Sequence, residues 1–183
     1  DLYFADKVIM VEGTTERLLM PRLRELVDKS LPEHQKLASQ YVTCIEAGGA
    51  HAHLFYPLLD FLELKTLVVT DLDSIKKVEK ENNKKKKINV WEKCPVAEGT
   101  RTCNTAIRYW FAPKDIKKIE DFHLSLVELL AKTPTDKQVS CRRIAYQIPE
   151  DPNTDVCARS YEDALILANL KDFTLPNEED VVI

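Results

Sequence analysis

Short apolar runs alternate with longer amphipathic stretches in the first part of the chain. Three runs rich in β-branched residues, "KVIMV" (7–11), "YVTCIEA" (41–47) and "KTLVVT" (65–70), predict buried strands. Between them, leucines recur at helical spacing in "TTERLLMPRLRELVDKSL" (14–31), and "AHLFYPLLDFLEL" (52–64) has a similar pattern. Strand and helix alternate with connections too long for hairpins. This order predicts an α/β fold with a mainly parallel sheet and right-handed crossovers.

The first helix has two local signals. A threonine at its start suits the N-cap position, and Pro21 inside it predicts a kink or a shortened first turn. The rest of the chain is less regular. It predicts a short polar helix and a loop from Ser74, a strand at 88–91, helices at 104–112 and 116–132, a strand at 141–148 and a serine-capped helix at 160–170.

Acidic residues follow each of the three predicted strands. Glu12 ends the first, with Glu16 one turn into the next helix; Glu46 ends the second, just before Gly48 and Gly49; and Asp71 and Asp73 follow the third. Ligands of open parallel sheets bind beyond the carboxyl ends of the strands, so these acids are expected to face one crevice. We expect Glu46 to be structural, and the glycines either form a turn or let the backbone approach a phosphate.

Converging carboxylates repel one another unless cations lie between them. Oxygen ligands without paired cysteine or histidine suit Mg²⁺ or Mn²⁺ rather than zinc. Two such ions would activate a water and stabilise the leaving oxygen in phosphodiester cleavage. The sequence therefore predicts a site for two divalent ions. His51 and His53 alternate, but they are interpreted as loop or surface residues.

Two other interpretations of "VVTDLDSI" (68–75) stay open. Aspartates after a strand are common in turns and at helix N-caps, with no chemistry attached. The same string resembles the motif of haloacid-dehalogenase-type phosphatases, whose first aspartate is a nucleophile. That motif usually opens a fold, whereas here an earlier strand with its own acid precedes it.

Charge is distributed unevenly. Residues 76–118 hold 13 of the 26 Lys and Arg residues against five acids, so this segment is +8 although the chain is −4. Such asymmetry favours an anionic partner, and Lys84, Lys85, Lys86, Lys87 and Arg101 are the candidate DNA-binding residues. The aromatic residues Trp91, Tyr109, Trp110 and Phe111 are interpreted as core rather than as a base-stacking platform.

Composition narrows the class of protein further. With 44% apolar residues the chain can form a hydrophobic core, and no apolar run approaches the length of a membrane span. Five scattered cysteines without a C-x-x-C pair favour reduced thiols in a cytoplasmic protein. Because the chain starts at Asp1 and stops at Ile183 in mid-pattern, we expect it to be a piece of a larger protein.

Three strings, in order, carry a family resemblance: "FADKVIMVEGTTERLLMP", "EAGGAHAHLFYPLLDFLELKTLVVTDLDS" and "RSYEDALILAN". "VEG" after a first strand and "DLD" after a third resemble the TOPRIM signature. The whole resembles the nuclease half of the overcoming-lysogenization-defect (OLD) family of ATP-dependent endonucleases. This resemblance implies a TOPRIM, Rossmann-like core over residues 1–112 and a mainly helical extension over 113–183.

The resemblance also assigns roles. Glu12, Asp71 and Asp73 match the catalytic, metal-binding acids, Glu16 a second acid, and Glu98 a further metal ligand. Ser74 would orient a metal-bound water, and Gly13, Gly48, Gly49, Arg159 and Glu162 would shape the site.

The resemblance implies a Mg²⁺- or Mn²⁺-dependent DNA endonuclease. Its partners would be DNA and an N-terminal ABC-type ATPase of the same polypeptide, and ATP would act only through that ATPase. A helicase or a second copy of the chain would be a further partner, and no membrane would be involved. The competing interpretation is a non-catalytic module that binds DNA or a partner.

Overall fold

The computed structural model describes residues 2–82, 84–149, 154 and 156–173. The chain forms two compact units, each assembled from two segments. The first unit comprises residues 1–70 and 133–145, and the second comprises residues 71–132 and 146–183. This division does not coincide with the expected boundary at residue 112, because residues 142–145 add a strand to the sheet of the first unit. The assignment of 1–112 to a TOPRIM core stays a prediction.

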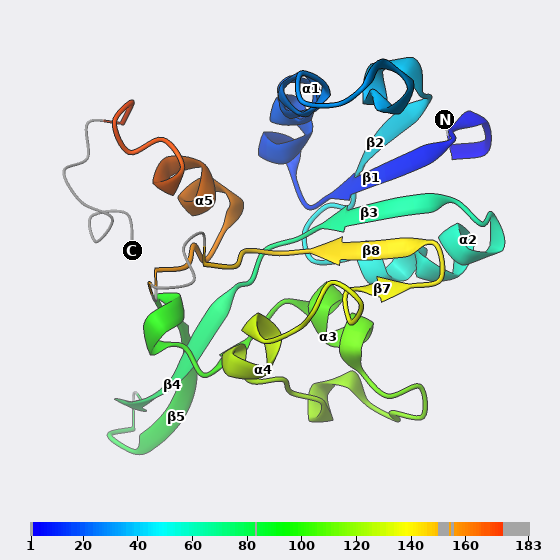
Figure 1. Ribbon diagram of the computed structural model, residues 1–183. Helices are drawn as coiled ribbons and strands as arrows, with labels where there is room; N and C mark the ends of the chain where they lie inside the picture. Colours follow the sequence, from blue (N-terminus) through cyan, green and yellow to red (C-terminus); the bar gives the residue numbers. More distant parts are fainter. Residues whose placement is uncertain (1, 83, 150–153, 155, 174–183) are drawn as a thin grey trace. The chain divides into compact units, whose positions relative to one another are not determined.

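A five-stranded sheet forms the centre of the first unit, in the order β2-β1-β3-β8-β7 (Figure 1). Parallel pairing joins β1 to β2, β1 to β3 and β3 to β8, and only β7 runs antiparallel. The predicted α/β class with a mainly parallel sheet is therefore confirmed. The strands are β1 (Lys7–Val11), β2 (Val42–Glu46), β3 (Lys65–Val69), β7 (Gln138–Val139) and β8 (Arg142–Ala145).

Helices cover both faces of this sheet. On one face, Met20 of α1 (Thr14–Asp28) packs with Ile9 and Val11 of β1. On the other face, Asp60 of α2 (Tyr56–Phe61) binds Arg142 of β8. Three 3₁₀ turns, at Glu33–Gln35, Leu37–Ser39 and Ala52–Phe55, lie in the connections, and another, Leu2–Phe4, precedes β1.

The start of α1 differs from its prediction. Gly13, not a threonine, is the N-cap residue, and Thr14 is the first residue of the helix. Pro21 lies within a helix that continues to Asp28. The leucine pattern does not mark the buried face, since Leu18 is 69% and Leu26 46% exposed, whereas Met20, outside that pattern, is 7% exposed.

A three-stranded antiparallel sheet, in the order β5-β4-β6, forms part of the second unit. Strand β4 (Ser74–Glu81) and strand β5 (Lys87–Lys93) make a long hairpin, and β6 (Arg101–Thr102) pairs with the start of β4. The short polar helix predicted from Ser74 is therefore wrong, and the strand predicted at 88–91 belongs to β5.

Within its described residues, the second unit has the helices α3 (Thr105–Phe111), α4 (Leu126–Leu130) and α5 (Tyr161–Leu167), with 3₁₀ turns at Val96–Glu98 and Ile119–Asp121. Asn104 caps α3 and Ser160 caps α5, as predicted for the latter. The helix predicted over 116–132 forms only from Leu126 to Leu130.

The aromatic residues predicted as core divide into two groups. Trp110 is 8% exposed, whereas Trp91 is 43% and Tyr109 is 44% exposed. No described helix is both long and apolar enough to cross a membrane.

Gly99 lies where the second unit has no room for a side chain. A Cβ at this position would collide with Leu126 Cδ1 and lie 3.0 Å from the Cβ of Ser74, which is fully buried. We expect Gly99→Ala to lower the free energy of unfolding by about 1–3 kcal/mol through overpacking. Guanidinium unfolding measures this loss, with Ala97→Ser, on the exposed side of the same turn, as the control. Equal stability of the two variants would contradict this packing.

Candidate functional site

Glu12 directly follows β1 and is held from two sides within the first unit. The buried hydroxyl of Thr70, which directly follows β3, donates a hydrogen bond to Glu12 Oε1. The backbone carbonyl of Glu12 accepts a hydrogen bond of 2.8 Å from the Gly49 N–H. The carboxylate is thereby fixed at the carboxyl ends of two neighbouring parallel strands, β1 and β3.

The backbone geometry of the Gly48-Gly49 turn favours glycine at both positions. Gly48 has φ +72° and Gly49 has φ +96°, which are positive values that other residues adopt at a cost. The Gly48 carbonyl lies 3.0 Å from Nδ1 of His51, so this histidine closes the turn. The turn brings the Gly49 N–H to the backbone carbonyl of Glu12, and this hydrogen bond holds the two glycines next to Glu12.

Glu16 is buried in the first turn of α1, only 6% exposed. Its Oε2 accepts a 3.1 Å hydrogen bond from the Gly13 N–H, which offsets part of the cost of burying a carboxylate. A Cβ at Gly13 would lie 3.2 Å from the same oxygen, so glycine leaves room for this contact. Glu46, interpreted as structural, accepts hydrogen bonds from Thr14 and Arg17.

Asp71 begins the second unit, and one amide side chain holds it together with Leu72. Gln147 Nε2 donates to Asp71 Oδ1 at 2.8 Å, and Gln147 Oε1 accepts from the Leu72 N–H at 2.6 Å. The Leu72 side chain is fully buried. Sequence reasoning missed Gln147, since 76 residues separate it from Asp71 and no motif marks it.

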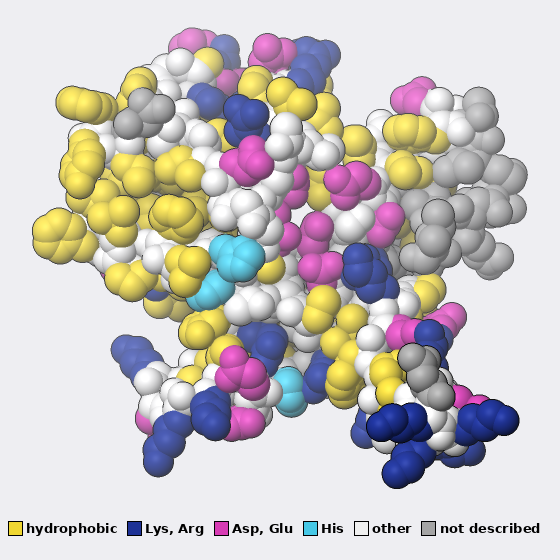
Figure 2. Space-filling model, turned by 180° about the vertical axis from the view of Figure 1, so that it is seen from behind, with side chains coloured by type: hydrophobic (Ala, Val, Ile, Leu, Met, Phe, Trp, Pro, Cys, Tyr) yellow, Lys and Arg dark blue, Asp and Glu magenta, His cyan; other side chains and the backbone are white. Residues whose placement is uncertain are grey.

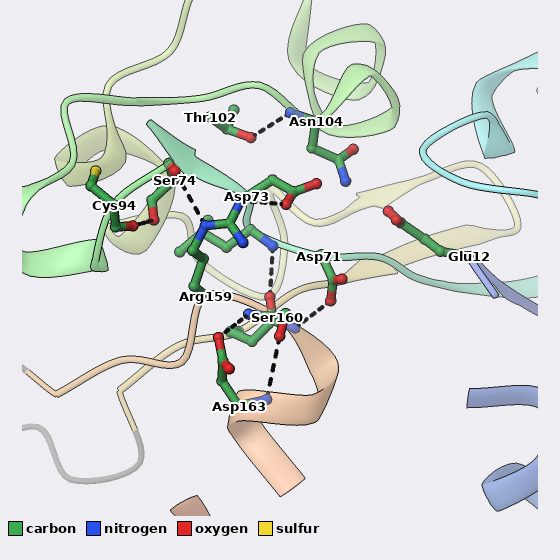
Figure 3. Close-up of polar contacts among 12 residues, drawn as sticks. Glu12, Asp71, Asp73, Ser74, Cys94, Thr102, Asn104, Arg159, Ser160 and Asp163 are labelled. Atoms are coloured by element: carbon green, nitrogen blue, oxygen red, sulfur yellow. Dashed lines mark hydrogen bonds and ion pairs between the residues drawn. The ribbon is translucent and has the colours of Figure 1, made fainter. Parts of the chain in front are cut away.

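Asp73 has a left-handed backbone, with φ +50°, and Arg159 holds it at several points (Figure 3). Arg159 Nη2 lies 2.9 Å from Asp73 Oδ1, and Nε donates to the Ser74 carbonyl. The Asp73 N–H in turn donates to the Arg159 carbonyl at 3.1 Å. Arg159, a predicted site-shaping residue, thus determines how the Asp73 carboxylate is presented.

Other predicted residues have different surroundings. Ser74 is fully buried and its hydroxyl donates to the Cys94 carbonyl, so in this structure it supports the hairpin base. Glu98 forms an ion pair with Lys76, and both side chains are well exposed. Glu162 lies exposed in the first turn of α5.

The predicted acids divide between the two units, with Glu12 and Glu16 in the first and Asp71, Asp73 and Glu98 in the second. Among the described residues, no group of three or more His, Cys, Asp or Glu side chains is arranged to hold a metal ion. The chemistry of these donors nevertheless fits Mg²⁺ or Mn²⁺, because carboxylate oxygens are the ligands those ions prefer.

The predicted DNA-binding lysines gather at the tip of the β4–β5 hairpin, where Lys and Arg side chains crowd the surface in Figure 2. Asn82 Oδ1 accepts hydrogen bonds from the N–H groups of Lys84 and Lys86, and Lys85 has φ +55°. This tight turn leaves the side chains of Lys84 to Lys87 exposed. Arg101 lies apart from them, at the base of the hairpin in β6.

The family comparison covers the strands and acids just described. A family model for the TOPRIM domain of overcoming-lysogenization-defect-like proteins matches residues 3–73, from before β1 to Asp73. Residues 3–73 are a TOPRIM domain of the OLD type. The matched part contains Glu12, Glu16, Asp71 and Asp73, so the resemblance inferred from the motifs is confirmed.

A curated relative extends the similarity beyond the TOPRIM domain. The chain is 30% identical over 172 residues to endonuclease GajA of Bacillus cereus (strain HuB5-5), which covers 94% of this chain. The chain spans only about a fifth of that relative's length, 21%. No solved structure shows significant similarity to this chain.

Proposed function

We propose that this chain, whose residues 3–73 match an OLD-type TOPRIM domain, is a nuclease that hydrolyses phosphodiester bonds in DNA with divalent metal ions. One observation carries the proposal: acids follow two neighbouring parallel strands of a TOPRIM sheet. Glu12 comes directly after β1, and Asp71 and Asp73 come after β3, from which Thr70 separates them. Similarity to a relative named as an endonuclease supports the same class of reaction.

Glu12, Asp71 and Asp73 are the proposed ligands for Mg²⁺ or Mn²⁺, with Glu16 and Glu98 as further acids if two ions bind. Such ions, when bound, supply an activated water and stabilise the charge on the leaving oxygen. The contribution of the chain is to orient the carboxylates beforehand. Thr70 orients Glu12, Gln147 orients Asp71, and Arg159 orients Asp73.

The exposed lysines Lys84 to Lys87 are proposed to contact phosphates, together with Arg101. Contacts of this kind add affinity without reading sequence, and they weaken as salt rises. For the whole protein, we propose that an N-terminal ABC-type ATPase belongs to the same polypeptide and that ATP acts through it. We further propose a helicase or a second copy of the chain as a partner, and a cytoplasmic location.

Plasmid cleavage tests the proposed activity. Supercoiled DNA is incubated with the protein in Mn²⁺, in Mg²⁺, in Ca²⁺ or in EDTA, and nicked and linear products are measured. We expect cleavage with Mn²⁺ or Mg²⁺ and none in EDTA. DNA binding without cleavage would favour the non-catalytic module, and hydrolysis of p-nitrophenyl phosphate without plasmid cleavage would favour the phosphatase.

Gln147 offers a test of how the acids are positioned. In Gln147→Met the amide contacts with Asp71 and the Leu72 N–H are lost, while side-chain length is retained. We expect cleavage to fall about tenfold and the Mn²⁺ concentration for half-maximal cleavage to rise, as for residues that orient metal ligands. Gln138→Met, on an exposed strand, should change neither value. An unchanged Mn²⁺ requirement in Gln147→Met would show that Gln147 does not position Asp71.

A further inference from the structure

The two faces of the β4–β5 hairpin differ in chemistry. Cross-strand partners share a face, and side chains alternate between faces along each strand. Lys77 is paired with Trp91 and Ile75 with Lys93, so these residues lie on one face, the Trp91 face. Lys76 is paired with Glu92, and Lys80 with Ile88, on the opposite face.

Trp91 is stacked but still open to solvent. The Arg101 guanidinium carbon lies 3.5 Å from the centre of the indole ring, within cation–π distance. Arg101 pairs with Ile75, which places it on the same face. Trp91 nevertheless keeps 43% of its surface exposed, unlike Trp110 at 8%. An indole fixed by a cation and still accessible is a surface on which another flat group can stack.

Charge distinguishes the faces further. On the opposite face Lys76 forms an ion pair with Glu98, and Lys80 forms one with Glu92, so carboxylates neutralise these lysines. Lys77 and Lys93, on the Trp91 face, have no ion-pair partner among the residues that the structure describes. The positive charge available to an anionic ligand at the hairpin base is therefore beside the exposed indole.

We propose that the Trp91 face binds an unpaired nucleotide of single-stranded DNA. The base stacks on Trp91, while Lys77, Lys93 and Arg101 bind the flanking phosphates. Proteins commonly bind single-stranded DNA by stacking its bases on aromatic rings that lie among basic residues. This works for any sequence, because every base presents a π-face. A base inside a duplex is already stacked on its neighbours, so the Trp91 face selects single-stranded or locally opened DNA. This inference rests on the proposed function only in taking DNA as the substrate.

Tryptophan fluorescence tests the proposal without altering Trp91 itself. The chain has two tryptophans, so Trp110→Phe leaves Trp91 as the reporter. The protein is titrated with a short oligothymidylate, and separately with a duplex of the same length, in EDTA so that no cleavage occurs. We expect the single strand to quench Trp91 emission strongly and the duplex to quench it weakly. Binding of the single strand without quenching would overturn the proposal.

Affinity measurements with matched variants complete the test. Trp91→Ala should weaken single-strand binding about tenfold, and Trp91→Phe should keep most of it. Ile88→Ala is the control, because Ile88 is exposed to a similar extent, 41%, on the opposite face. Equal affinities of Trp91→Ala and Ile88→Ala would also overturn the proposal.

The outcomes separate this inference from the nuclease proposal. If the single strand quenched Trp91 emission but the plasmid were not cleaved in Mn²⁺, the results would support single-strand binding at the Trp91 face and contradict the nuclease proposal. Metal-dependent cleavage without quenching would support the nuclease proposal and contradict binding at the Trp91 face.

Discussion

Asp71→Asn is expected to lower Mn²⁺-supported plasmid cleavage at least a hundredfold. Asparagine keeps the shape of the side chain and an oxygen that can accept the Gln147 amide hydrogen bond, but it removes the negative charge. A ligand to a catalytic ion supports several kcal/mol of transition-state stabilisation, and each 1.36 kcal/mol changes the rate tenfold. The measurement is the rate of nicking at saturating Mn²⁺.

The comparison variant is Asp115→Asn, which removes the same charge from an exposed position in the same unit. It should cleave at the wild-type rate. Thermal unfolding of both variants shows whether the fold persists. A folded Asp71→Asn protein that nicks DNA as fast as Asp115→Asn would exclude Asp71 as a metal-binding catalytic residue.

Asp60→Ala is expected to lower the free energy of unfolding by about 3 kcal/mol. Arg142 is nearly buried, and its guanidinium binds both Asp60 oxygens, at 2.6 and 2.9 Å, while stacking on Tyr56. Removing the carboxylate takes both Asp60 hydrogen bonds and the negative charge of Asp60 away from a nearly buried cation. This contact also joins α2 to β8, two elements far apart in sequence, so its loss weakens the whole first unit. The expected drop in Tm is about 6–12 °C.

An exposed ion pair provides the control for this experiment. Arg22 and Glu25 lie 2.7 Å apart on α1 with more than half of each side chain exposed. Arg22→Ala should change the free energy of unfolding by less than about 1 kcal/mol, because water and salt screen such pairs. If Asp60→Ala and Arg22→Ala lowered the free energy of unfolding equally, the Asp60–Arg142 pair would stabilise the first unit no more than an exposed ion pair does.

Much of the first unit could be predicted from sequence because its central strands are short runs dominated by apolar, β-branched residues. In Lys7–Val11 and Lys65–Val69 the apolar residues follow one another after a single lysine or a lysine and a threonine, and the last four residues of β1 are all buried. The β4–β5 hairpin could not be predicted from sequence, because an exposed two-stranded ribbon needs few apolar residues. In β4 only Ile75 and Val78 are apolar, so the alternation that marks a strand is absent. Its lysines and glutamates are equally typical of a polar helix.

The candidate acids were found from their position after strands, which is a local signal. Their partners were not. Thr70 follows β3 without any motif, yet its hydroxyl reaches Glu12, 58 residues earlier. Gln147 and Arg159 reach Asp71 and Asp73 from the second segment of the second unit. Such contacts depend on how distant segments pack, which one sequence's periodicity does not record.

The buried Leu72 changes how the D-x-D pattern should be defined when sequences are searched. Its side chain is fully enclosed, and its N–H is bound by the same glutamine that holds Asp71. The middle position is therefore an anchor that sets the direction of the carboxylates on either side, and a polar residue there would cost free energy. A pattern of acid, large apolar residue, acid should exclude many chance matches that acid, any residue, acid accepts.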